Sequence, residues 1–302
     1  WQPAVLSSGG CGNTLRALRC AALKEGKTML ETLREMFSYG FMLRALLCGT
    51  LVALCLALLG VSLVLKRYSM IGDGLSHVGF GAVSVGLVLG IAPLAVAVPV
   101  VMLAAFLLLR ISSSSSINGD AAIALISSSA LAAGLIVTSL SSGMNADVNG
   151  YLFGSILAMS SSDVALSAVL SAVVLFLYLF CYHRIFAITF DEAFGRATGV
   201  RVGFYNTLLA MLTAVTVVVG MRMMGALLIS SLVIFPALTA MRVFQSFRGV
   251  VLCSAGAAVC CFAAGLVLSY LYSLPAGASV VLVNLAAFAA FSAVGAALHR
   301  TC

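Results

Sequence analysis

The sequence predicts an all-α membrane protein, built as a polytopic bundle of eight or nine transmembrane helices. Of its 302 residues, 63% are hydrophobic and only 8% are charged, whereas a soluble domain has about 25% charged residues. Apolar runs of about 20 residues, the length that crosses a bilayer, recur along the chain between short polar segments. No polar segment is long enough to form a second domain.

Nine apolar segments are candidate membrane spans. They cover residues 43–65, 73–90, 92–110, 120–140, 163–182, 202–220, 224–242, 249–271 and 278–298. The second and third are joined so closely, through Gly90 to Pro93, that they must form a hairpin. Met221 to Met224 is expected in a loop on the outer side of the membrane, between the sixth and seventh spans.

The basic residues predict the orientation of the bundle. The net charge of +7 does not indicate nucleic-acid binding, because Lys and Arg of a membrane protein mark its cytoplasmic loops. We therefore expect membrane lipid and other proteins, and no nucleic acid, as partners. With nine spans, the cytoplasmic side can hold Lys66, Arg67, Arg110, Arg184, Arg196, Arg201, Arg242, Arg248 and Arg300.

The first 28 residues differ from the rest of the chain. They are rich in Gly, Cys and basic residues, and they lack the apolar core of a signal peptide. Their basic residues would lie on the outer side, against the positive-inside rule, and a start at Met29 would remove them. We interpret residues 1–28 as a non-native or disordered extension, and residues 29–302 as the membrane domain.

One polar stretch stands out within the apolar sequence, from Met70 to Gly81. It carries Asp73 and His77 four residues apart, so both lie on one face of a helix. An ionisable residue inside a membrane segment costs about 2.5–3.5 kcal/mol on insertion scales and indicates a functional site. A carboxylate oxygen and an imidazole nitrogen together suit a divalent cation such as zinc or manganese.

The surroundings of this pair leave a choice between two interpretations. Gly81 and Ser84 continue the same helix face, and small residues there leave room for close packing or for a passage. The alternative is that Asp73 caps the start of its helix and that His77 hydrogen-bonds a neighbouring helix.

Two polar loop segments are further candidates. Residues 183–200 contain Asp191 and Glu192 ahead of Arg196 and Gly199, a pattern that fits a short helix ending at the glycine. On the cytoplasmic side such a helix is a candidate docking element; the alternative is an ordinary loop helix. The other segment, 141–162, is rich in turn-forming residues, and it holds two candidate residues for the point where a metal enters, Asn145 and Asp147.

The chain carries no recognisable catalytic motif. It lacks a GxxxxGK[ST] loop, a Gly-x-Ser-x-Gly elbow and HExxH, so we expect no catalytic residues, and ATP-driven transport would need a separate ATPase. A membrane enzyme would need convergent polar residues, and the chain has only nine acidic ones. A proton-coupled secondary transporter, with Asp73 as the protonatable group, would be supported by internal repeats, and none is visible.

Several motifs together resemble the membrane permeases of ABC-type zinc, manganese and iron importers, with the zinc-uptake permeases nearest. They occur in the order of the family within residues 41–298, as Arg67 to His77, Asp147 to Gly154, Phe190 to Val200, Gly225 to Ala237 and Pro275 to Ser279.

The resemblance implies an ABC importer permease fold in the cytoplasmic membrane of a bacterium. It implies a homodimer, driven by two cytoplasmic ATP-binding-cassette ATPases and supplied by an extracytoplasmic metal-binding protein. Zinc is the expected cargo, with manganese or iron as alternatives, and no cofactor is permanently bound. The resemblance makes Asp73 and His77 the metal-contacting pair, and it assigns to the coupling helix Asp191, Glu192, Ala193, Phe194 and Gly199.

Overall fold

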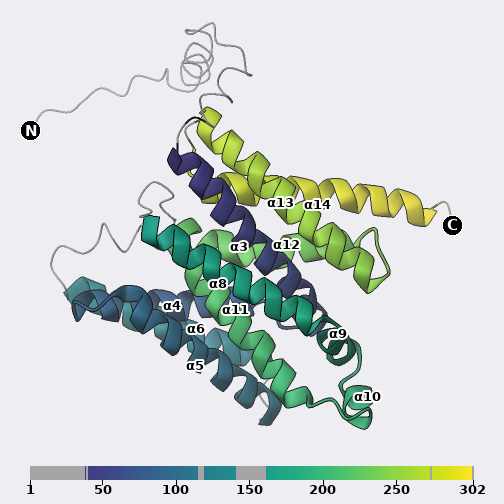
Figure 1. The fold of residues 1–302 in the computed structure, drawn as a ribbon, viewed down its shortest axis with the longest axis horizontal. Helices are drawn as coiled ribbons and strands as arrows, with labels where there is room; N and C mark the ends of the chain where they lie inside the picture. The colour runs from purple at the N-terminus through teal and green to yellow at the C-terminus, as the bar shows by residue number, and fades with distance from the viewer. Residues whose placement is uncertain (1–37, 39, 115–118, 141–160, 273, 301–302) are drawn as a thin grey trace, which may run out of the picture.

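The computed structural model describes residues 38, 40–114, 119–140, 161–272 and 274–300, and every regular element in these ranges is a helix (Figure 1). Within the described ranges, seven helices are long and apolar enough to cross a membrane. They are α3 (Gly40–Leu65), α4 (Ile71–Val88), α5 (Pro93–Ser114), α6 (Gly119–Leu140), α11 (Val202–Met224), α13 (Phe247–Tyr272) and α14 (Ala276–Arg300). The predicted all-α membrane bundle is therefore confirmed.

An eighth crossing is formed by a bent pair of helices, if the two are counted as one span. They are α8 (Ser161–Phe180) and α9 (Tyr182–Phe190), which meet at 66°. A six-residue helix, α10 (Glu192–Ala197), follows α9 and leads through a short turn into α11. Figure 1 shows α10 at the tip of the molecule, beyond the ends of α9 and α11.

The expected span over residues 224–242 is shorter than the sequence suggested. Its helix, α12 (Ala226–Met241), has 16 residues, or about 24 Å at 1.5 Å per residue, and a bilayer core is about 30 Å thick. It packs against α3, α4, α11, α13 and α14. A helix buried among other helices is as apolar in sequence as one that faces lipid, so composition alone could not separate the two.

Only one residue, Gly225, separates α11 from α12. Its backbone has φ 83° and ψ 156°, a region that is essentially restricted to glycine. The expected outer loop at Met221–Met224 is therefore wrong, because these residues form the last turn of α11, with three of the four side chains buried. Irregular backbone at membrane depth is tolerated where protein surrounds it, and this break meets that condition.

Four helices, α3, α4, α11 and α12, form the buried centre of the bundle. Most of α3 and α4 is buried, whereas α5, α6 and α14 expose broad apolar faces. Around α4 lie α5, α6, α11 and α12, so that protein covers most of its circumference. A helix with an acid and an imidazole thus occupies the interior of the bundle rather than its lipid-facing surface.

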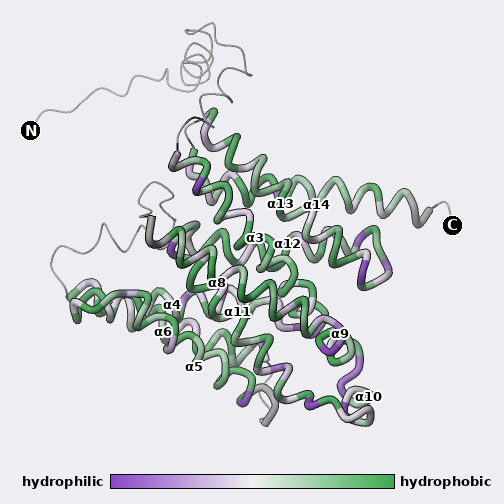
Figure 2. The backbone as a smooth tube through the Cα atoms, in the orientation of Figure 1, coloured by the Kyte–Doolittle hydropathy of each residue, from purple (hydrophilic) through white to green (hydrophobic). Residues whose placement is uncertain are grey.

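The polar helix ends gather at one end of the bundle. Figure 2 shows hydrophilic residues around α9, α10 and the loop between α12 and α13, and mostly hydrophobic residues along the long helices. Lys66 bonds to Glu192, and Arg110 and Arg196 line one cavity. This clustering agrees with the predicted placement of the basic residues on one side of the membrane, which the positive-inside rule makes cytoplasmic.

Candidate functional site

The start of α4 positions the acidic member of the predicted pair. Met70 occupies the N-cap position without a side-chain hydrogen bond, and Asp73 lies in the first turn. Asp73 is therefore not the capping residue, although its charge is favourable near a helix N-terminus. His77 follows one turn later, so the two side chains leave α4 on the same face.

The atoms of Asp73 and His77 have a separation that suits two ligands of one ion. His77 Nε2 lies 3.5 Å from Asp73 Oδ2, and the two side chains are 26% and 36% exposed. Two ligands held about 2.1 Å from a tetrahedral zinc ion would be about 3.4 Å apart. The pair therefore has both the chemistry and the spacing for a transition metal, at a partly open point of a buried helix.

Further polar groups surround this pair. Ser230, in the second turn of α12, lies beside the Asp73 carboxyl group, and Ser76 Oγ donates to the Asp73 carbonyl oxygen at 2.7 Å. His77 Nδ1 is buried and has no hydrogen-bond partner among the described residues. A metal-bound histidine usually donates from its second nitrogen to a neighbouring acceptor, and the described residues supply no such acceptor to His77.

The same helix face is closed beyond His77. A Cβ atom at Gly81 would lie 2.6 Å from the Ala130 carbonyl oxygen of α6, and one at Gly134 would lie 2.8 Å from the Gly81 Cα. Ser84 Oγ donates to the Phe80 carbonyl oxygen at 3.0 Å. Of the two uses that small residues allow here, the structure shows close helix packing at Gly81 and Ser84 rather than a passage.

The structure brings no third metal ligand to the pair from its described residues. No group of three or more His, Cys, Asp or Glu side chains there could hold an ion. The candidate residues for metal entry, Asn145 and Asp147, lie outside the described residues.

The predicted docking segment forms α10. Asp191 caps this helix, since its Oδ1 accepts from the backbone nitrogens of Ala193 at 2.8 Å and Phe194 at 2.9 Å. Gly199 adopts φ 80° and ends the segment, as the sequence indicated. The predicted short helix is therefore present, and Phe194 lies on its exposed side with 62% of its surface accessible.

Glu192 faces the opposite way and joins a cluster that sequence reasoning missed. Its Oε1 accepts from Lys66 Nζ at 2.7 Å and from Asn206 Nδ2 at 2.9 Å, and Lys66 Nζ also donates to Asn206 Oδ1 at 2.7 Å. Burial would raise the pKa of Glu192, but the hydrogen bonds from Lys66 and Asn206 and the charges of Lys66 and Arg196 outweigh it and lower the pKa. The sequence signal that could have indicated this cluster is Asn206, a polar residue within the otherwise apolar start of α11.

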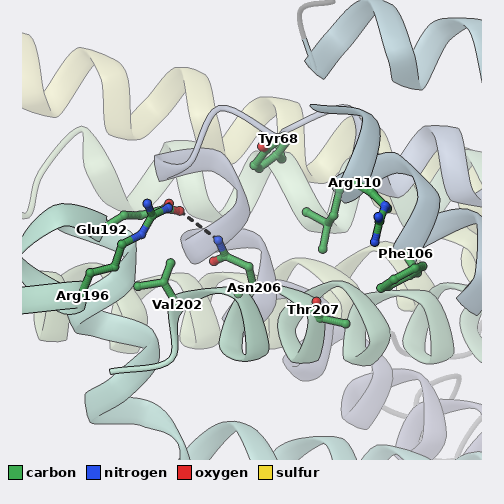
Figure 3. Close-up of a pocket in the computed structure, with 10 residues that line it drawn as sticks. Tyr68, Phe106, Arg110, Glu192, Arg196, Val202, Asn206 and Thr207 are labelled. Atoms are coloured by element: carbon green, nitrogen blue, oxygen red, sulfur yellow. Dashed lines mark hydrogen bonds and ion pairs between the residues drawn. The ribbon is translucent and has the colours of Figure 1, made fainter. Parts of the chain in front are cut away.

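A cavity of about 550 Å³ lies beside this cluster, between the end of α5 and the starts of α10 and α11. Figure 3 shows Glu192 and Asn206 meeting on one side of it, with Arg110 and Phe106 on the other. Because Arg196 Nη2 is also 3.7 Å from Glu192 Oε2, the Glu192 carboxylate stands between two cations.

Comparison with known families decides which kind of membrane protein this is. A profile described as the ABC 3 transport family matches residues 38–295. The chain belongs to the ABC 3 transport family. The expected resemblance to the permeases of ABC-type zinc, manganese and iron importers is thereby confirmed, as is a multi-pass membrane protein. Permease subunits of this kind are not themselves catalytic.

Relatives and a solved structure agree with this membership of the ABC 3 family. The chain is 29% identical over 84% of its length to the manganese import system permease protein ScaB of Streptococcus gordonii, covering 91% of that protein. It is 28% identical over 79% of its length to the high-affinity zinc uptake system membrane protein ZnuB of Haemophilus influenzae, covering 91% of it. The structure of PsaBC from Streptococcus pneumoniae superposes with a TM-score of 0.78 at 28% identity, over 87% of this chain and 95% of that one.

Proposed function

We propose that this chain is the membrane permease of an ATP-driven importer of a divalent transition metal, with zinc as the transported ion. The observation that carries the proposal is the Asp73–His77 pair, whose oxygen and nitrogen lie 3.5 Å apart on a helix surrounded by protein. Relatives named for zinc uptake and for manganese import support a metal cargo. Manganese and iron are the alternatives.

The donor atoms favour zinc among these metals. An imidazole nitrogen binds zinc well, whereas manganese prefers carboxylate, carbonyl and water oxygens. For a given set of nitrogen and oxygen ligands, affinity also rises from manganese through iron toward the later metals. His77 is therefore the residue that should decide between zinc and manganese.

Two protein ligands suit an ion that must leave again. Structural zinc sites have four, and such a cage would hold the ion too firmly for transport. We propose that water completes the site, or that a second copy does so in a homodimer, where a two-fold axis near α4 would double the ligands.

The proposed importer needs two further proteins. The sequence has no phosphate-binding loop, so we infer a separate cytoplasmic ATPase that hydrolyses ATP. The proposed docking helix is α10, which lies at the tip of the molecule and exposes the Phe194 ring. An extracytoplasmic binding protein would deliver the metal from the other side, toward Asn145 and Asp147.

Radioactive zinc, manganese and iron uptake tests this proposal. Cells that express the chain with its ATPase should accumulate zinc. Asp73→Asn and His77→Ala should both insert normally, because each change makes the helix less costly to bury in the membrane. At matched membrane levels, both variants should abolish zinc accumulation. Ser127→Ala, a change on the neighbouring helix α6, is the matched control and should transport normally. Near-normal uptake by both site variants would contradict the site, and ATPase-independent uptake would favour the proton-coupled alternative.

A further inference from the structure

The cluster of Lys66, Asn206 and Glu192 joins the end of α3 to two consecutive helices, α10 and α11, whose cluster residues lie 126 and 140 positions further along the chain. Lys66 follows the last residue of α3, Glu192 begins α10, and Asn206 lies in the second turn of α11. All three pairs among these side chains are hydrogen-bonded, at 2.7, 2.7 and 2.9 Å. Three mutual bonds form a closed ring, which leaves little freedom for any one segment to move without the others.

Lys66 is buried to a degree that is unusual for lysine. Its side chain is only 6% exposed, and lysine is almost never buried unless it is paired. A buried ion pair adds little net stability compared with an apolar contact of the same shape. Such a pair can instead hold a particular arrangement of its elements, and at this position it holds α10 against the end of α3.

The turn after Lys66 is a rigid connection to α4. Arg67 has φ 62°, its backbone nitrogen bonds the Val64 oxygen at 3.1 Å, and the Tyr68 nitrogen bonds the Leu63 oxygen at 2.9 Å. These are the two bonds of a Schellman motif, with arginine in the left-handed position that glycine usually takes. The turn then passes into α4 with a bond from the Ile71 nitrogen to the Tyr68 oxygen at 3.1 Å.

The same path ends at the metal pair. Asp73 lies in the first turn of α4, seven positions after Lys66, and the residues between them form the hydrogen-bonded turn. On the other side of the cluster, α10 is held by Glu192 and by Gly195, whose backbone packs near Val202 and Ile188. A displacement of α10 would therefore reach the start of α4 through Lys66.

We propose that Lys66 is a positioning residue that, through its bonds to Glu192 and Asn206, transmits movement of α10 to Asp73 and His77. This inference rests on the proposed function, in which an ATPase docks on α10 and moves it. Lys66 is buried, so it lies outside both the exposed face of α10 and the Asp73–His77 pair. Its loss should leave docking on the exposed face of α10 intact and should separate ATP hydrolysis from metal movement.

The test is the ratio of zinc transported to ATP hydrolysed in vesicles that contain the complete importer. Lys66→Met keeps the length of the side chain and removes its charge, so the ratio should fall roughly tenfold while hydrolysis continues, as expected for the loss of hydrogen bonds between charged groups. The paired exchange Lys66→Glu with Glu192→Lys should restore most of the ratio. Arg201 serves as the matched control because it is not a member of the hydrogen-bonded cluster. Arg201→Met should leave the ratio of zinc transported to ATP hydrolysed unchanged.

The outcomes separate this inference from the proposed function. Wild-type vesicles that move no zinc, manganese or iron with ATP would overturn both. A normal wild-type ratio that Lys66→Met leaves unchanged would overturn the positioning role alone, and so would a fall in Lys66→Met that the paired exchange does not reverse. If neither Lys66 variant inserts, Asn206→Ala decides: it should lower the ratio several-fold, and an unchanged ratio would contradict the proposal.

Discussion

Glu192 and Phe194 stand two positions apart in α10 and face opposite surroundings. The Glu192 carboxylate accepts hydrogen bonds from Lys66 and Asn206, whereas the Phe194 ring is 62% exposed. Two positions in a helix are about 200° apart, so the two side chains cannot share a face. Glu192 therefore anchors α10 to the bundle, and Phe194 is the residue that a docked ATPase would cover.

Replacing Phe194 should separate the permease from its ATPase. Phe194→Ala removes an aromatic side chain from the proposed interface, where such anchors contribute at least about 2 kcal/mol, so ATPase co-purification should fall more than tenfold. Phe204→Ala is the matched control, because Phe204 is 61% exposed in the first turn of α11. Equal co-purification by both variants would show that α10 does not dock through Phe194.

Acid should weaken the attachment of α10. The pKa of Glu192 is lowered in the folded protein, so its contribution to stability is present above the ordinary glutamate pKa and is lost as the pH falls through the lowered value. The groups that act on it are Lys66, Arg196 and Asn206. The Glu192 side chain is 42% exposed, so solvent screens part of this contribution.

Thermal unfolding of purified protein measures this acid effect. At neutral pH the wild-type protein should have a higher melting temperature than Glu192→Gln. This difference in melting temperature should shrink as the pH falls below the ordinary pKa range of glutamate. A difference that stays constant to acid pH would contradict the assignment.

Enlarging Gly81 should force α4 and α6 apart. A Cβ atom there would lie 2.6 Å from the Ala130 carbonyl oxygen, and backbone cannot move aside as a flexible side chain can. Gly81→Ala should therefore destabilise the protein by about 1–3 kcal/mol, the usual cost of overpacking, and lower its melting temperature in detergent. Gly203→Ala is the control, since that position has no atom within 4 Å and alanine favours a helix; equal effects of the two variants would refute close packing at Gly81.

The membrane class, most of the spans and the shared helix face of Asp73 and His77 could be predicted from sequence because each depends on local properties. An apolar run of about 20 residues predicts a spanning helix wherever it occurs, and four-residue spacing places Asp73 and His77 on one face of any helix. The capping pattern from Asp191 to Gly199 likewise predicted α10, which the structure confirms.

Contacts between distant segments decided the rest. Lys66 and Glu192 are 126 positions apart, and no local pattern says that a lysine at the end of α3 will be buried against α10. From the sequence alone, Gly81 could line a passage or allow close packing, and only its contact with α6 shows that it allows packing. Likewise, the sequence of α12 is compatible with a membrane span, and only its neighbours show that it is a short, buried helix. Periodicity and composition report what one helix buries, whereas only the tertiary packing determines what it is buried against.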